Sequence, residues 1–139
     1  KAQAYEKIVL FLGLPQAYET EGLDRKNLDL PSGQIKLLKK LLEINPNIVC
    51  VVLAGSVVNL VPLNQAKGLL YAYLSGEAGA LAIMDLLYGI KNPSGRLAET
   101  FIEKVEDSNI KINKNLRIFY DETIFVGYRY YNTFDKDVV

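Results

Sequence analysis

Four carboxylate side chains gather near the start of the chain. Glu19, Glu21, Asp24 and Asp29 follow an apolar run that ends at Gly13. Open α/β sheets bind ligands at the carboxyl ends of their strands, where an acidic loop could supply a general acid, a base or a nucleophile. The same residues also fit a solvated surface loop, because charged side chains are mostly exposed. A calcium site is less favoured, since the run lacks the spacing of an EF-hand loop.

The absence of histidine from the sequence removes several common catalytic designs. Ser–His–Asp and Cys–His arrangements need an imidazole, and catalytic zinc and iron sites usually take imidazole ligands. The glycines form neither G-x-x-x-x-G-K nor G-x-G-x-x-G, which disfavours nucleotide binding. We therefore expect no cofactor and no metal. The chemistry then falls to carboxylates, tyrosines, lysines or backbone groups.

Charge and apolar content are those of an ordinary globular protein. Sixteen basic and sixteen acidic residues cancel, so nothing indicates a nucleic-acid partner. The longest apolar runs, such as Ile48–Ala54, are too short to cross a bilayer, and no secretory signal is evident at the N-terminus. The single cysteine, Cys50, is expected to be a buried thiol in a reducing compartment, which predicts a cytoplasmic protein. The length predicts one domain over residues 1–139.

Hydrophobic periodicity predicts an α/β fold. The apolar runs Lys7–Gly13 and Ile48–Ala54 lack alternation, which is typical of strands covered on both faces. Between them, Pro31 opens a helical pattern that ends at Asn45, and two strands joined by a helix form a βαβ unit. We expect a mainly parallel sheet with helices on both faces, a three-layer sandwich. The remaining predictions are a strand over Gly68–Leu74, a helix over Glu77–Tyr88 with Ser75 as N-cap, irregular backbone over Glu103–Asn115, and short strands within Leu116–Tyr120 and Ile124–Tyr131.

Several segments, in order along the chain, resemble one enzyme family. They are Glu19–Arg25 (E-T-E-G-L-D-R) with Pro31 and Gln34, Ala54–Ser56 (A-G-S), Tyr73–Gly79 (Y-L-S-G-E-A-G), Asn92–Phe101 (N-P-S-G-R-L-A-E-T-F) and Tyr120–Tyr131 (Y-D-E-T-I-F-V-G-Y-R-Y-Y). These segments are similar to the E-G-x-D-R…L-P-x-x-Q, N-P-S-G-[RK]-L-x-x-T-F and Y-x-E-G-I-F-V-G-Y-R-Y-Y signatures of glycoside hydrolase family 3 β-glucosidases. One departure is Thr123, which stands where the family commonly has glycine.

The resemblance implies a place within a larger enzyme. Family members usually carry an N-terminal (β/α)₈-type barrel with a nucleophilic aspartate, followed by an α/β sandwich that contributes the acid/base carboxylate. The chain resembles the later part of that sandwich and is incomplete relative to it. The expected partners are therefore that barrel domain and a carbohydrate substrate, on whose rings Tyr128, Tyr130 and Tyr131 could stack unless they lie in the core. The isolated chain is expected to be inactive and, through exposed apolar surface, able to self-associate.

The resemblance also assigns roles within the acidic loop. The residue at the family's acid/base position is Glu21, and Gly22 beside it would let the loop bend. A guanidinium against the acid would oppose its protonation, so Arg25 is expected to pair with Asp24 or another carboxylate and to hold the loop. We therefore predict Glu21 as the catalytic residue and Asp24 and Arg25 as loop-supporting residues. A non-catalytic α/β module that binds a partner is the alternative.

Overall fold

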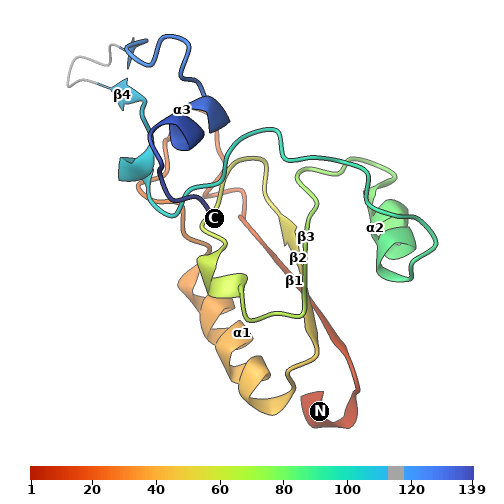
Figure 1. Cartoon of the computed structure of the whole chain (residues 1–139). Helices are drawn as coiled ribbons and strands as arrows, with labels where there is room; N and C mark the ends of the chain where they lie inside the picture. The colour runs from red at the N-terminus through yellow and green to blue at the C-terminus, as the bar shows by residue number, and fades with distance from the viewer. Residues whose placement is uncertain (113–117) are drawn as a thin grey trace.

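The computed structural model describes residues 1–112 and 118–139 (Figure 1). Parallel strands alternate with helices in the first two thirds of the chain, and shorter elements follow. The elements are β1 (Ile8–Gly13), α1 (Ser32–Ile44), β2 (Ile48–Leu53), β3 (Gly68–Tyr71), α2 (Gly79–Leu87), β4 (Lys111–Ile112), β5 (Ile118–Phe119) and α3 (Tyr128–Thr133), with short 3-10 turns at Ala2–Ala4, Val61–Leu63 and Val105–Asp107. Within these described ranges, no helix is long and apolar enough to span a membrane.

The three long strands form a parallel sheet in the order β1-β2-β3. In the register of β1 and β2, Ile8 lies opposite Ile48 and Gly13 opposite Leu53. Strand β2 is central, and its sequence I-V-C-V-V-L is buried along most of its length, as the unbroken apolar run predicts. Cys50 in this strand is a free, fully buried thiol, and burial raises its pKa.

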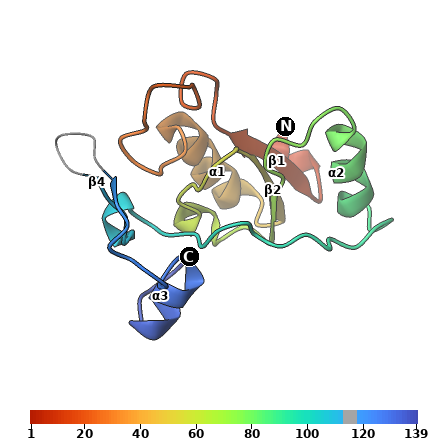
Figure 2. The same ribbon diagram turned by 90° about the horizontal axis from the view of Figure 1, so that it is seen from above.

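Helices cover the two faces of the sheet, which confirms the predicted α/β architecture. Figures 1 and 2 show α1 and α2 on opposite sides of the strands. The main hydrophobic core contains Leu38 of α1 together with Cys50 and Val52 of β2. Because side chains alternate along a strand, Val51 points to the opposite face, where it is also fully buried. The βαβ unit β1-α1-β2 thus forms the sheet and the helical layer on one of its faces, and α2 lies on the other face.

Helix α2 is shorter than predicted and begins at Gly79 instead of Glu77. The predicted N-cap Ser75 is wrong, because the residue before the helix is Ala78 and no side chain caps it. The Ser75 side chain instead occupies the space where a side chain at position 79 would lie. The predicted strand over Gly68–Leu74 is likewise shorter and ends at Tyr71.

The predicted strand over Ile124–Tyr131 is wrong, because this segment runs into helix α3. Aromatic residues favour strands by propensity, but here they pack at helical spacing: the rings of Tyr130 and Phe134, four residues apart, have centroids 5.3 Å apart. Tyr131 is buried in the core, whereas Tyr128 is exposed. In the turn before this helix, Thr123 has φ +51°, a left-handed conformation that explains why glycine suits this position.

The segment before this turn is only partly irregular. The sequence predicts irregular backbone over residues 103–115, yet this segment contains the short turn Val105–Asp107 and strand β4. Strand β5, at Ile118–Phe119, falls within the predicted strand Leu116–Tyr120 and pairs antiparallel with β4. Residues 113–117, on which parts of both predictions fall, lie outside the described residues.

Candidate functional site

The acidic loop, residues 14–31, joins the carboxyl end of β1 to helix α1. Thr20 and Leu23 form an isolated antiparallel bridge, so Glu21 and Gly22 are the two central residues of a tight turn. Gly22 has φ +81°, a conformation that a residue with a Cβ rarely adopts. The turn therefore places Glu21 at its tip, where the side chain is exposed to solvent. Asp24, just beyond the bridge, is also exposed.

Glu19 lies at the base of this turn and is bound to the segment that follows β2. Its Oε1 accepts a hydrogen bond from the backbone N–H of Gly55 at 2.8 Å and another from the Ser56 hydroxyl at 3.2 Å. The two glutamates of the turn thus differ in their surroundings. Glu19 is engaged by its own domain, whereas Glu21 makes no hydrogen bond within the described residues.

Arg25 fastens the other side of the turn to the same place. Its Nη2 donates to the Ser56 hydroxyl at 3.0 Å and to the carbonyl oxygen of Val57 at 2.6 Å. Nη1 is buried and has no hydrogen-bond partner among the residues that the structure describes. The guanidinium is therefore placed on the segment after β2, and not on Asp24, because this segment offers two acceptors in one direction.

Ser56 is the hub to which both arms of the turn bind. Its hydroxyl donates to Glu19 and accepts from Arg25, and its carbonyl oxygen accepts a hydrogen bond from the Tyr71 hydroxyl at 2.6 Å. Burial raises the pKa of the Tyr71 hydroxyl, and the neighbouring Tyr73 raises it further. The hydroxyl therefore keeps its proton and remains a donor. The ends of β1, β2 and β3 are thereby linked at one edge of the sheet.

We expect Arg25→Ala to lower the free energy of unfolding by about 2 kcal/mol, because it removes two hydrogen bonds from a charged, partly buried donor. The matched control is Arg96→Ala, since the Arg96 side chain is exposed and bonds only to its neighbours Ser94 and Gly95. This control should change stability by less than about 0.5 kcal/mol. Denaturant unfolding of the two variants measures the difference, and equal stabilities would contradict the anchoring role of Arg25.

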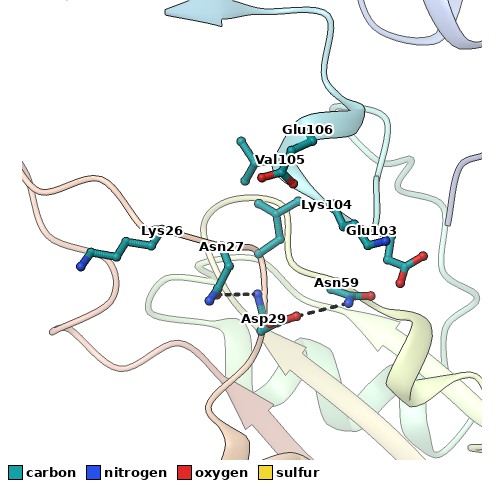
Figure 3. A pocket seen from close by; sticks show the side chains of 9 residues that line it. Lys26, Asn27, Asp29, Asn59, Glu103, Lys104, Val105 and Glu106 are labelled. Atoms are coloured by element: carbon teal, nitrogen blue, oxygen red, sulfur yellow. Dashed lines mark hydrogen bonds between the residues drawn. The ribbon is translucent and has the colours of Figure 1, made fainter. Parts of the chain in front are cut away.

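A polar pocket of about 290 Å³ lies beside the second half of the acidic loop (Figure 3). Asp29 lies on its wall, where Oδ1 accepts from Asn59 Nδ2 at 3.3 Å and the backbone N–H donates to Asn27 Oδ1 at 3.1 Å. Side chains of both charges also line the pocket, among them Lys26, Lys104, Glu103 and Glu106. Asp29 thus belongs to a separate feature from Glu21. In the described part of the chain, no three His, Cys, Asp or Glu side chains form a metal-binding group.

Sequence reasoning missed the residues that hold the loop. Ser56 stood only within a matched segment, and Tyr71 and Gln34 had no assigned role. Each contributes a polar group near the end of a parallel strand or in the first turn of α1, and that position was the signal available in the sequence. Their partners, however, lie 15 to 37 residues away along the chain, so local patterns did not pair them.

The chain is similar in sequence and in structure to known proteins. The family described as “Glycosyl hydrolase family 3 C-terminal domain” matches residues 1–128. The chain is 42% identical over 135 residues to the “Thermostable beta-glucosidase B” of Acetivibrio thermocellus and 39% identical over 141 residues to the “Exo-alpha-(1->6)-L-arabinopyranosidase” of Bifidobacterium longum. It is also similar to the crystal structure of a Bifidobacterium adolescentis GH3 beta-glucosidase, with 44% identity and a TM-score of 0.91.

These matches cover nearly all of the chain but only a small part of each relative. They cover 95%, 99% and 99% of the chain, but the chain spans only 18%, 19% and 21% of the respective proteins. The similarity therefore concerns one part of much longer relatives.

Proposed function

The chain belongs to glycosyl hydrolase family 3 and corresponds to its C-terminal domain, and from this we propose that it supplies the acid/base carboxylate of a retaining, exo-acting β-glycosidase. The names of its relatives favour a β-glucosidase, with an arabinopyranosidase as a second possibility for the sugar. The observation that carries the proposal is the contrast between two glutamates of one turn. Glu21 stands free at the tip, whereas its neighbour Glu19 is bound to Gly55 and Ser56 in the segment after β2.

In the proposed mechanism, Glu21 acts twice. A retaining glycosidase places two carboxyl groups about 5–5.5 Å apart across the scissile bond. One carboxylate attacks the anomeric carbon, while the protonated Glu21 transfers its proton to the departing glycosidic oxygen. The resulting Glu21 carboxylate then removes a proton from water, and that water releases the sugar. The nucleophile would come from the barrel domain that we propose as the partner of this chain.

Glu19 is the competing carboxylate, and its contacts argue against it. To reach a substrate, its Oε1 would have to leave the N–H of Gly55 and the hydroxyl of Ser56, both within 3.2 Å. Each lost hydrogen bond to a charged group costs about 1.5–3 kcal/mol. Glu21 pays no such cost, because it is exposed at the tip of the turn. We therefore assign Glu19 to support of the loop and Glu21 to proton transfer.

The variant Glu21→Gln of the longer protein tests the proposal. Glutamine keeps the size of the side chain but carries no transferable proton. A loss of kcat/KM that grows as the leaving group becomes more basic supports proton donation by Glu21. A loss that is equal for all leaving groups, or no loss, contradicts it. The alternative of a non-catalytic partner-binding module predicts no loss at all.

We expect the isolated chain to show no hydrolysis of aryl β-glucosides above the buffer rate. A single solvent-exposed carboxyl group cannot both attack the anomeric carbon and protonate the leaving group. It also cannot hold the sugar in a reactive position by itself. The measurement is release of the aryl alcohol at high protein concentration, with the longer protein as positive control. Turnover by the purified chain would contradict the need for a second domain.

The barrel domain of the same protein is the proposed partner of the surface around Glu21. Apolar side chains are also exposed elsewhere, including Val9 and Phe11 on β1, at 45% and 52%. In the isolated chain this apolar surface would favour self-association. We propose the cytoplasm as the location of the protein.

A further inference from the structure

One side chain, Gln34, closes the base of the acidic loop. Its Nε2 donates to the carbonyl oxygen of Gly13 at 2.9 Å, and its Oε1 accepts from the N–H of Gly13 at 3.0 Å. Gly13 is the last residue of β1, and Gln34 lies in the first turn of α1. The two residues that make these bonds are 21 positions apart and enclose the whole loop.

The position of Gly13 in the sheet explains why an amide is required. The N–H of Ile8 donates to Asn47 at 2.9 Å and that of Leu14 to Leu53 at 3.1 Å, so even-numbered residues of β1 face β2. The N–H and C=O of Gly13 therefore face the other edge, where no strand pairs with β1 among the described residues. A primary amide has both a donor and an acceptor and replaces the missing strand.

Gly13 is also confined from the side of β2. A methyl group at this position would overlap the carbonyl oxygen of Leu53, so the backbone of β1 approaches β2 more closely than a side chain allows. Gln34 holds the opposite side of the same residue. The point at which the loop leaves the sheet is thus fixed from both sides, by Leu53 and by Gln34.

We infer that Gln34 is a positioning residue for the reaction: by fixing Gly13 to α1, it determines where the turn presents Glu21. The inference rests on the proposed role of Glu21. Gln34 itself is partly buried at the base of the loop and is assigned no contact with the substrate. A displacement of about 1 Å at a reacting group can lower a rate by about 10²-fold, so a change at the base of the loop should be visible in catalysis.

The test compares Gln34→Met with Gln65→Met in the longer protein. Methionine preserves length and helix propensity but removes both hydrogen bonds, and Gln65 is an exposed residue outside the acidic loop that serves as the matched control. For Gln34→Met we expect kcat/KM to fall by at least about tenfold for an alkyl β-glucoside and by less than about threefold for a dinitrophenyl β-glucoside, with KM little changed. Gln65→Met should match the wild type with both substrates.

Hydrogen exchange provides a readout that does not depend on the role of Glu21. In Gln34→Met, the backbone amides of residues 13–25 should exchange faster than in the wild type. Faster exchange with an unchanged leaving-group dependence would overturn the inference, provided that Glu21→Gln shows that dependence. Unchanged exchange would overturn it directly. If Glu21→Gln shows no leaving-group dependence, the proposed function fails instead.

Gln34→Glu decides the question if Gln34→Met does not fold. A protonated carboxyl group has one donor and one acceptor and restores both bonds to Gly13, whereas a carboxylate has only acceptors. Relative to the wild type, the activity of Gln34→Glu with the alkyl β-glucoside should be highest at low pH and fall as the pH rises and the introduced carboxyl group ionises. A constant ratio across the pH range would overturn the inference.

Discussion

Replacing Glu21 with glutamine in the longer protein is expected to lower kcat/KM for alkyl β-glucosides by about 10²–10⁴-fold, the usual contribution of general acid catalysis. An alkoxide is a poor leaving group and depends on the donated proton, whereas a dinitrophenolate departs without it. The loss of kcat/KM with a dinitrophenyl β-glucoside should therefore be much smaller. Kinetics with a series of aryl and alkyl β-glucosides measure this dependence.

Two further glutamates make the result specific. Glu77→Gln removes a negative charge from an exposed residue outside the acidic loop and should leave all rates unchanged. Glu19→Gln keeps an acceptor for Gly55 but weakens the anchor of the turn that presents Glu21. Its loss of activity should therefore also be larger for poor leaving groups, but much smaller than the loss in Glu21→Gln. If Glu19→Gln instead shows the steep leaving-group dependence and Glu21→Gln does not, the two roles must be exchanged.

The sequence was sufficient for the βαβ unit that carries the loop. Strand β2 lies at the centre of the sheet with both faces covered, so its apolar run could be read without ambiguity. The aromatic run at Tyr128–Tyr131 was misread because strand propensity and helical packing compete there, and packing of Tyr130 against Phe134 favours the helix. The start of α2 was misplaced, because Ser75 suits an N-cap by type but packs beside Gly79.

Within the candidate site, local features could be predicted and distant pairings could not. Gly22 next to Glu21 indicated a bend, and the structure has a tight turn there with φ +81° at the glycine. The partner of Arg25 depends on where β2 ends in space, which its own neighbours in sequence do not specify. The nearest carboxylate in sequence, Asp24, was the natural expectation, yet the guanidinium lies on Ser56 and Val57, more than 30 residues away.

Gly13→Ala should be the most destabilising of the substitutions considered for the sheet. The added methyl group would overlap the carbonyl oxygen of Leu53, which is backbone and cannot rotate away, so β1 must shift. Overpacking of this kind costs about 3 kcal/mol of unfolding free energy, and the shift would also break the two bonds to Gln34.

The matched control for this substitution is Gly33→Ala. Nothing lies within 4 Å of a methyl group at Gly33, and the residue is in helix α1, so alanine should stabilise the protein by about 0.5–1 kcal/mol. Denaturant unfolding of both variants should therefore give shifts of opposite sign for the same chemical change. Because Gly13 is the point from which the acidic loop departs, Gly13→Ala should also lower activity with alkyl β-glucosides. Equal stability of the two variants would contradict the close approach of β1 to Leu53. Gly13 would then not be confined from the side of β2, as the positioning of the loop requires.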